Sequence, residues 1–190
     1  MKHNIFIVFL SLLLFLSGRG VVFGQSARAY VDQLDKNAVY ESKKGNYPLA
    51  FQYINKAIEI QPKRMDLYYH RAMIIGRAGD YGKAIIEFSR FVSNKKFPHA
   101  VRLRADCYMA IGMYERAVKD YLSFLKDAPR DGKVWSYLAE ACFLVGNTKA
   151  ALEAVQKGLA IRSHWSDRLR ILHEQIISGK QIVPHKPLTN

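Results

Sequence analysis

The chain has 190 residues, with 29 Lys and Arg against 16 Asp and Glu and a formal net charge of +13. This length suits one domain, and 49% hydrophobic with 24% charged residues is ordinary for a soluble globular protein. The composition therefore excludes a wholly disordered chain and a polytopic membrane protein. Basic chains include proteins that bind nucleic acid or anionic surfaces, so the distribution of the charge has to be examined.

Residues 1–24 differ in composition from the rest of the chain. A basic start precedes an apolar run from Ile5 to Leu16, and small residues follow as far as Gly24. This pattern predicts a secretory signal peptide that is cleaved after Gly24. The alternative is a retained N-terminal anchor, although twelve helical residues span only about 18 Å. Cleavage would remove two basic residues and no acidic one, which reduces the net charge from +13 to +11. The sequence thus predicts an exported protein, periplasmic or associated with the cell envelope, or secreted.

Four similar segments then follow one another at a nearly constant spacing. Each has a turn glycine, an alanine five residues later and a larger side chain four residues after the alanine. The glycines are Gly45, Gly79, Gly112 and Gly146, the alanines are Ala50, Ala84, Ala117 and Ala151, and the larger residues are Ile54, Phe88, Tyr121 and Val155. Because the glycines are separated by 34, 33 and 34 residues, the sequence contains an internal repeat.

Each repeat predicts a pair of antiparallel helices. Apolar residues at helical spacing precede each glycine, and glycine can adopt the positive φ that turns the chain back at a helix end. The residue after the glycine is Asn, Asp, Met or Asn, and three of these four can cap the next helix. The small alanines let the two helices approach closely, and Pro62 and Pro129 end two of the second helices. One apolar face of each pair stays uncovered, so the pairs must stack.

This pattern resembles the tetratricopeptide repeat (TPR) family, on the strength of the period, the Gly-Asp/Asn-Tyr turn, the small alanine and the terminating proline. The resemblance implies an all-α, right-handed solenoid of helical hairpins over residues 25–179. The units fall at about 31–64, 65–97, 98–131 and 132–164. Departures from the family pattern include Gly158 late in the fourth unit and the loss of one residue at the end of the second, where we expect an irregular junction.

A final helix and a tail follow the fourth unit. Trp165, Leu169, Leu172 and Ile176 recur at helical spacing, and the opposite face of this segment is polar, with Arg168 among its residues. Residues 165–179 therefore predict the capping helix that a repeat array needs. Residues 180–190 contain two prolines and predict a flexible tail.

Proteins of the TPR family bind peptides or partner proteins in a concave groove lined mostly by the first helix of each unit. By matching units, the resemblance assigns the following residues to that groove: Asp32, Asp35, Val39, Tyr69, His70, Met73, Arg77, Arg102, Asp106, Met109, Lys133, Tyr137, Glu140 and Phe143. Aromatic, methionine and arginine side chains suit a binding surface. The alternative is that Tyr69, Met73, Met109 and Phe143 only fill space between units. The Lys and Asn clamp with which some TPR domains hold a chaperone C-terminus is missing from the matching positions.

The sequence offers no recognisable catalytic or metal-binding motif. It lacks HExxH, CxxC, GxxxxGK[ST], GxGxxG after a strand and GxSxG, so we expect no enzyme activity, cofactor or metal site. Cys107 and Cys142 lie in apolar helical segments, which favours buried thiols over a disulfide. Acidic residues occur singly on otherwise basic faces, and no carboxylate pair is expected.

The basic charge is spread almost evenly over the repeats, whereas a nucleic-acid-binding protein would more often show clustered Lys and Arg. The predicted function is a non-enzymatic scaffold that holds a partner protein or peptide in or beside a cell-envelope complex. The alternative is an accessory protein that docks on anionic envelope polymers or membrane through its basic surface. The sequence predicts no nucleic-acid partner and no integral membrane span after signal cleavage, and leaves a homo-oligomer open.

Overall fold

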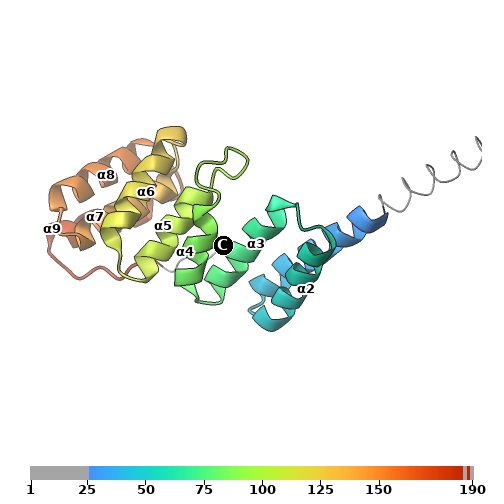
Figure 1. Cartoon of the computed structure of the whole chain (residues 1–190). Helices are drawn as coiled ribbons and strands as arrows, with labels where there is room; N and C mark the ends of the chain where they lie inside the picture. The colour runs from blue at the N-terminus through green and yellow to red at the C-terminus, as the bar shows by residue number, and fades with distance from the viewer. Residues whose placement is uncertain (1–25, 186–187, 189–190) are drawn as a thin grey trace, which may run out of the picture. The chain divides into compact units, whose positions relative to one another are not determined.

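The computed structural model describes residues 26–185 and 188, and each regular element among them is an α-helix (Figure 1). The all-α prediction is therefore confirmed. The predicted signal peptide, residues 1–24, lies outside the described residues. The chain divides into two compact units, with the boundary between Leu67 and Tyr68, and each unit is described separately below.

The helices alternate with short turns. After a first helix over residues 26–43 come α2 (Tyr47–Ile60), α3 (Met65–Arg77), α4 (Tyr81–Ser89), α5 (Ala100–Ala110), α6 (Tyr114–Asp127), α7 (Gly132–Leu144), α8 (Thr148–Ala160) and α9 (Ser166–Ile177). In the second unit α4 to α9 pack in chain order, each against the next, and α7 also contacts α9 (Figure 1).

The four predicted turn glycines, and Gly179 after α9, take the left-handed backbone conformation that glycine tolerates best. Gly45, Gly79, Gly112, Gly146 and Gly179 have φ between 64° and 92°. The residue after each glycine donates its backbone N–H to the carbonyl five residues back, as Asp80 does to the Ile75 oxygen at 3.2 Å. These bonds use carbonyls that a helix end would otherwise leave unpaired, so the same turn recurs after each of these helices.

The residues expected to cap the second helices behave differently from one another. Asp80 and Asn147 accept hydrogen bonds from the backbone N–H three residues later. Asn46 makes no such bond, and its amide nitrogen donates to Glu41 Oε2 at 3.1 Å, so the capping expectation for this residue is wrong. Met113 makes no side-chain cap.

The repeat alanines and their larger companions form the contact between helices. Ala50 and Ile54 are fully buried in the first unit, together with Val31 and Ala57. In the second unit the equivalent residues are also fully buried, and Tyr121 is the largest of them. Burial of an aromatic or branched side chain stabilises the folded state by about 1.5–3 kcal/mol, so this repeated position accounts for much of the stacking.

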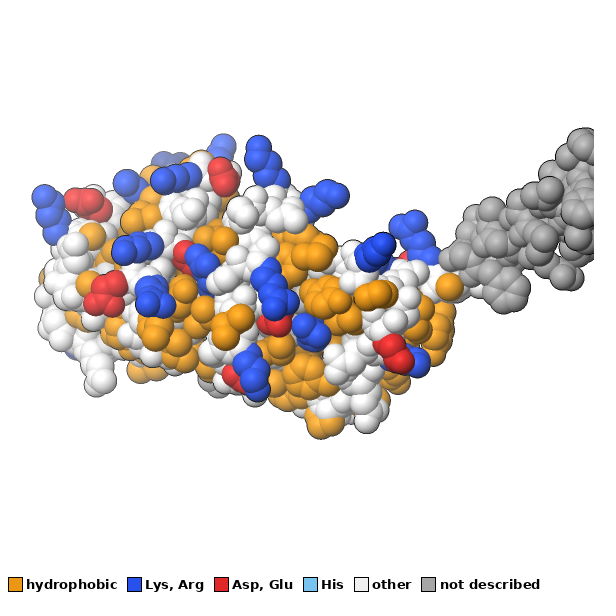
Figure 2. Space-filling view, viewed as in Figure 1, with side chains coloured by type: hydrophobic (Ala, Val, Ile, Leu, Met, Phe, Trp, Pro, Cys, Tyr) orange, Lys and Arg blue, Asp and Glu red, His pale blue; other side chains and the backbone are white. Residues whose placement is uncertain are grey.

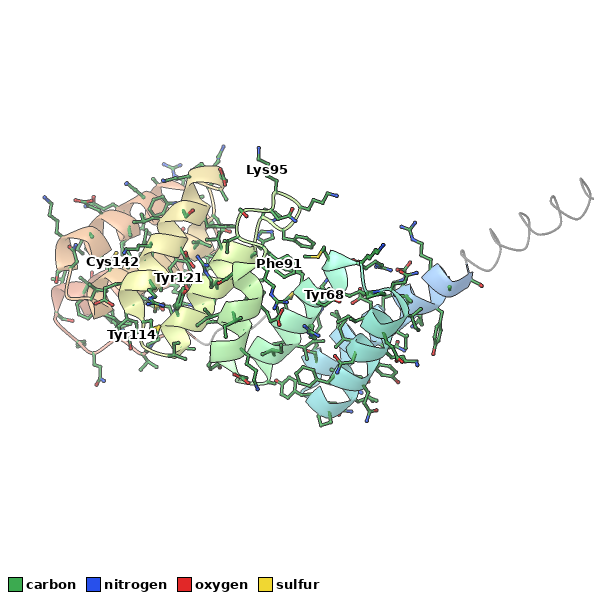
Figure 3. All side chains as sticks on the ribbon, in the orientation of Figure 1. Tyr68, Phe91, Lys95, Tyr114, Tyr121 and Cys142 are labelled. Atoms are coloured by element: carbon green, nitrogen blue, oxygen red, sulfur yellow. The ribbon has the colours of Figure 1, made fainter. Side chains whose placement is uncertain are left out.

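The junction after the second repeat is irregular, as the missing residue indicated. α4 has only nine residues, and turns replace helix between Arg90 and His99. Phe91 is fully buried in these turns, with its ring 4.9 Å from the Phe97 ring, whereas Lys95 extends outward from the loop (Figure 3). The buried aromatic residue holds the loop against the array although the helix has ended.

The segment after α9 lies against the repeats, which corrects the placement expected for a flexible tail. The coil turns back under the helices after Gly179 (Figure 1). Ile182 and Leu188 are 4% and 7% exposed, and Ile182 belongs to the core cluster of α5 to α9. Burial of these apolar side chains favours a docked segment over a solvated one.

Candidate functional site

The first helix of each repeat in the second unit contributes side chains to one surface that contacts the chain's own C-terminal segment. This surface is called the inner face below, and the described residues 182–185 and 188 are called the tail segment. The inner face consists of Met73, Gly76 and Arg77 on α3, Arg102 and Asp106 on α5, and Tyr137 and Glu140 on α7.

The His185 ring is the most closely held part of the tail segment. It stacks on the Tyr137 ring, with centroids 3.4 Å apart and planes inclined by 3°. Glu140 Oε2 lies 2.8 Å from His185 Nδ1 and also accepts the His185 backbone N–H at 3.1 Å. On the opposite edge, Nε2 lies 3.3 Å from the Tyr121 hydroxyl and 3.6 Å from Asp106 Oδ1. Both ring nitrogens therefore face hydrogen-bond acceptors.

Two arginines and one tyrosine hold the carboxylates in place. Arg102 Nη1 donates to Asp106 Oδ2 at 2.8 Å, and the Tyr121 hydroxyl donates to Asp106 Oδ1 at the same distance. Arg168, from α9, pairs with Glu140 Oε1. Asp106 and Glu140 are 2% and 0% exposed, and buried carboxylates of this kind need such partners.

The electrostatic environment favours the charged form of His185. Burial opposes protonation of the ring, but hydrogen bonds and charge attraction from Asp106 and Glu140 outweigh it, so the pKa of His185 is raised. Since the Tyr121 hydroxyl already donates to Asp106, its oxygen can accept the proton on Nε2. The geometry thus suits an imidazolium whose two N–H groups both donate.

Leu188 occupies a second, apolar site. It packs in a cluster that includes Ala72, Phe88 and Leu103, and Arg77 Nε donates to its backbone oxygen at 3.4 Å. Gly76 makes room for it, because a Cβ on this residue would lie 2.1 Å from Leu188 Cδ1. The missing side chain of Gly76 therefore creates the space that the leucine fills.

Six of the predicted groove residues contribute to these two sites. Arg102, Asp106, Tyr137 and Glu140 surround His185, directly or through one partner. Arg77 contacts the Leu188 backbone, and Met73 packs against the cluster that contains Leu188.

The remaining predicted groove residues lie elsewhere or serve packing. Met109 is 2% exposed in the core, and Phe143 packs against that core. Tyr69 meets the rings of Phe91 and Phe97, which is the space-filling role given as its alternative. The list is completed by Lys133, whose Nζ lies over the Tyr137 and Trp165 rings, by half-buried His70, and by Asp32, Asp35 and Val39, which are half-buried in the first unit.

Sequence reasoning missed several contributors to the site. Tyr121 was expected only as a core aromatic, Arg168 as part of the polar face of the capping helix, and His185 as part of a tail outside the array. The expectation of no carboxylate pair is also wrong, because Asp106 and Glu140 both face His185. One signal was present: each of these two acids lies six residues before the turn glycine of its repeat, so stacking brings them into neighbouring positions.

The two cysteines are free thiols buried on α5 and α7. Burial raises the pKa of Cys107 to about 12 and that of Cys142 to about 11. Across residues 26–185 and 188, no group of three or more His, Cys, Asp or Glu side chains is placed to hold a metal ion. None of the helices in the same range combines the length and apolar character needed to cross a membrane.

Comparison with known proteins agrees with this architecture. Residues 102–165 match the family model of the tetratricopeptide repeat. A tetratricopeptide repeat protein from Parabacteroides merdae superimposes with a TM-score of 0.66 at 18% identity, over 80% of this chain and 61% of that one. This is the tetratricopeptide repeat fold. The helical-hairpin solenoid predicted from the sequence is confirmed, and the TPR family is supported for the chain.

Curated relatives share the repeats over part of their length. Small glutamine-rich tetratricopeptide repeat-containing protein 2 of Mycosarcoma maydis is 34% identical over 85 residues, which make up 44% of this chain and 24% of that protein. Human serine/threonine-protein phosphatase 5 is 28% identical over 109 residues, or 57% of this chain and 21% of the phosphatase. The chain thus spans less than a quarter of the length of either relative, and these similarities assign it no catalytic family.

Proposed function

We propose that this TPR protein is a non-enzymatic scaffold whose inner face binds a non-helical segment of a partner protein. The observation that carries this proposal is the tail segment itself, a non-helical part of the chain that lies on this face. Tyr137 stacks on its ring, Glu140 accepts its backbone N–H, and Arg77 donates to a backbone carbonyl. Contacts to both side chains and backbone are the features by which peptide-binding surfaces hold an unstructured ligand.

Export and an envelope setting complete the proposed function. They rest on the basic start, apolar run and small residues of residues 1–24. N-terminal sequencing of the protein purified from its native cells tests this part. A mature chain that begins at Gln25 is the expected result, and a chain that keeps residues 1–24 in a soluble cell extract would contradict it.

The basic charge, +13 for the whole chain and +11 after the proposed cleavage, favours a second candidate function, in which the protein docks on anionic envelope polymers or membrane. Figure 2 shows Lys and Arg side chains spread over the visible face and separated by hydrophobic and uncharged groups. Because no cluster dominates this view, we place this function second. Binding of this kind weakens steeply as salt is added, whereas contacts to buried groups are screened much less.

Site-specific photocrosslinking in the native cells tests the scaffold function. A benzophenone amino acid replaces Met73 on the inner face, and the control carries it at Lys149, which is exposed on α8. We expect partner crosslinks that form from Met73 and survive moderate salt. These crosslinks should be lost when Tyr137→Ala is added. Equal crosslinking from Lys149, or crosslinks that Tyr137→Ala leaves unchanged, would refute the assignment of the partner site.

A further inference from the structure

We propose that the tail segment is an internal ligand of the partner site, so that a partner must present a planar cation followed three residues later by an aliphatic side chain in order to displace it. This inference rests on the proposed function of the inner face. It adds a ligand chemistry and a competitor encoded in the same chain.

The tail segment crosses the inner face in a defined direction. The chain turns at Gly179, Ile182 anchors it in the core, His185 meets α7 and α5, and Leu188 meets α3. The segment thus returns from the fourth repeat towards the second and touches the first helix of three successive repeats. An unrelated loop packed at one end of the array would not make this series of contacts.

The His185 site selects a planar cation. Tyr137 accepts a flat ring face to face, which a tetrahedral ammonium group cannot match. Asp106 and Glu140 face opposite edges of that ring, so a neutral apolar ring such as phenylalanine would remove the side-chain donor to Glu140 Oε2 and the positive charge beside both buried carboxylates. Loss of one donor to a buried charged acceptor weakens binding strongly. Imidazolium and guanidinium groups are the side chains that satisfy both requirements.

The Leu188 site selects an aliphatic side chain of limited size. Its walls include Ala72, Phe88 and Leu103, and its floor is the bare backbone of Gly76. A charged side chain would be desolvated there without a partner, whereas a leucine buries its apolar surface. The two sites are filled by residues three positions apart, which sets the spacing that a competing segment has to reproduce.

Tethering makes the tail segment an effective competitor. An intramolecular ligand on a short connection acts at an effective concentration in the millimolar range, so a tail of modest intrinsic affinity can still fill the site. A tail docked for about nine-tenths of the time weakens partner binding about tenfold. Release of the tail therefore raises the affinity for a partner without changing the site.

A synthetic fluorescent peptide with the sequence of residues 180–190 tests the proposal by anisotropy on the full-length chain. The wild-type chain should bind it weakly, because its own tail fills the site. The chain that carries His185→Ala with Leu188→Ala should bind it at least about tenfold more tightly. A peptide with the same two alanines should not bind either chain. Equal binding by the two chains, or equal binding of the two peptides, would overturn the proposal.

A matched pair of glycine variants tests the apolar site. In the chain with the released tail, Gly76→Ala should weaken peptide binding at least about tenfold, because the added methyl group enters the space of the leucine. Gly82→Ala makes the same chemical change on α4, where a Cβ would meet nothing closer than the Asp80 carboxylate at 4.0 Å, and should leave binding unchanged. Equal effects of the two substitutions would count against the site.

An NMR measurement on the wild-type chain keeps the proposal testable if the chain with His185→Ala and Leu188→Ala is poorly folded. A comparison of peptide binding with partner crosslinking distinguishes failure of this proposal from failure of the proposed function. In the wild-type chain, stacking on Tyr137 should shift the His185 ring protons upfield in NMR spectra, and Gly76→Ala should reduce that shift. An unshifted ring would overturn the docked tail. If the tail peptide fails to bind while partner crosslinks still form from Met73, the internal-ligand proposal fails and the proposed function stands. If the crosslinks from Met73 are absent while the tail peptide still binds, the proposed function fails and the internal-ligand proposal stands.

Discussion

Gly158 is the position at which the packing of the capping helix can be tested most directly. It lies near the end of α8 and is buried. A Cβ at this residue would lie 2.8 Å and 3.1 Å from the two δ carbons of Leu169 on α9, and 3.0 Å from the Cβ of Trp135 on α7. Leu169 can shift by rotation, but the Trp135 Cβ is fixed to the backbone. Gly158→Ala should therefore push α8 away from both neighbouring helices.

The expected magnitude follows from two opposing effects. Overpacking a buried contact by one methyl group costs about 1–3 kcal/mol. Alanine stabilises a helix interior by about 1 kcal/mol relative to glycine. The net expectation for Gly158→Ala is a loss of about 1 kcal/mol in the free energy of unfolding. Gly82→Ala gains the same helix propensity without a clash and should stabilise by about 0.5–1 kcal/mol.

Urea denaturation followed by helical circular dichroism measures both variants, and amide hydrogen exchange shows where the effect lies. Faster exchange confined to α7, α8 and α9 in Gly158→Ala is expected, because the added methyl group meets side chains of α7 and α9 and each repeat contacts only its neighbours. A double-mutant cycle with Leu169→Ala should recover part of the penalty, while the contact with Trp135 remains. If Gly158→Ala stabilises the protein as much as Gly82→Ala does, the close approach of these three helices is not present in solution.

Three further predictions concern single residues. Met113→Asn should stabilise α6 by about 0.5–1 kcal/mol in urea denaturation, because Asn147 caps α8 from the equivalent position and Met113 has no such bond; an unchanged midpoint would contradict this. Cys107 and Cys142 should react with a disulfide reagent slowly in the native protein and fast in denaturant, since burial raises both thiol pKa values; fast native labelling at neutral pH would refute their burial. Binding of the tail peptide to the tail-released chain should be strongest below about pH 6.5 and weaken as the pH rises through the raised pKa of docked His185, whereas a peptide with alanine at that position should show no such change.

The repeated part of the fold was predictable because its signals are local and recur at a fixed period. Gly79 and Gly112, like the other repeat glycines, take positive φ two residues after the last residue of a helix, and the alanine five residues later is buried each time. Gly158 departs from the family pattern for a physical reason that the sequence of its own unit does not reveal. The side chains of Leu169 and Trp135 occupy the space that a larger residue would need.

The tail contacts could not be predicted in the same way, because they join residues far apart in the sequence and have no period. His185 reaches Glu140 and Tyr121, which precede it by 45 and 64 residues, and Leu188 reaches Arg77 across 111. Hydrophobic periodicity also assigns a helix face but not the reach of a long side chain. Arg168 therefore looked solvated, although its guanidinium extends to a buried carboxylate while its side chain remains 41% exposed.

The charge of the tail and that of the array together predict how binding responds to salt. Residues 180–190 carry Lys180, Lys186 and the ring of His185, and the rest of the described chain is also basic, so the two repel at long range. Attraction arises only at contact, where the carboxylates of Asp106 and Glu140 are already paired with arginines. Added salt screens the repulsion over about 10 Å and leaves the buried contacts largely unchanged.

The affinity of the tail peptide for the tail-released chain should thus change little between about 50 and 500 mM NaCl. A basic surface that binds phosphate groups would instead lose affinity steeply over this range, by orders of magnitude for several contacts. A steep loss for the tail peptide would mean that exposed charges, and not the inner face, hold it.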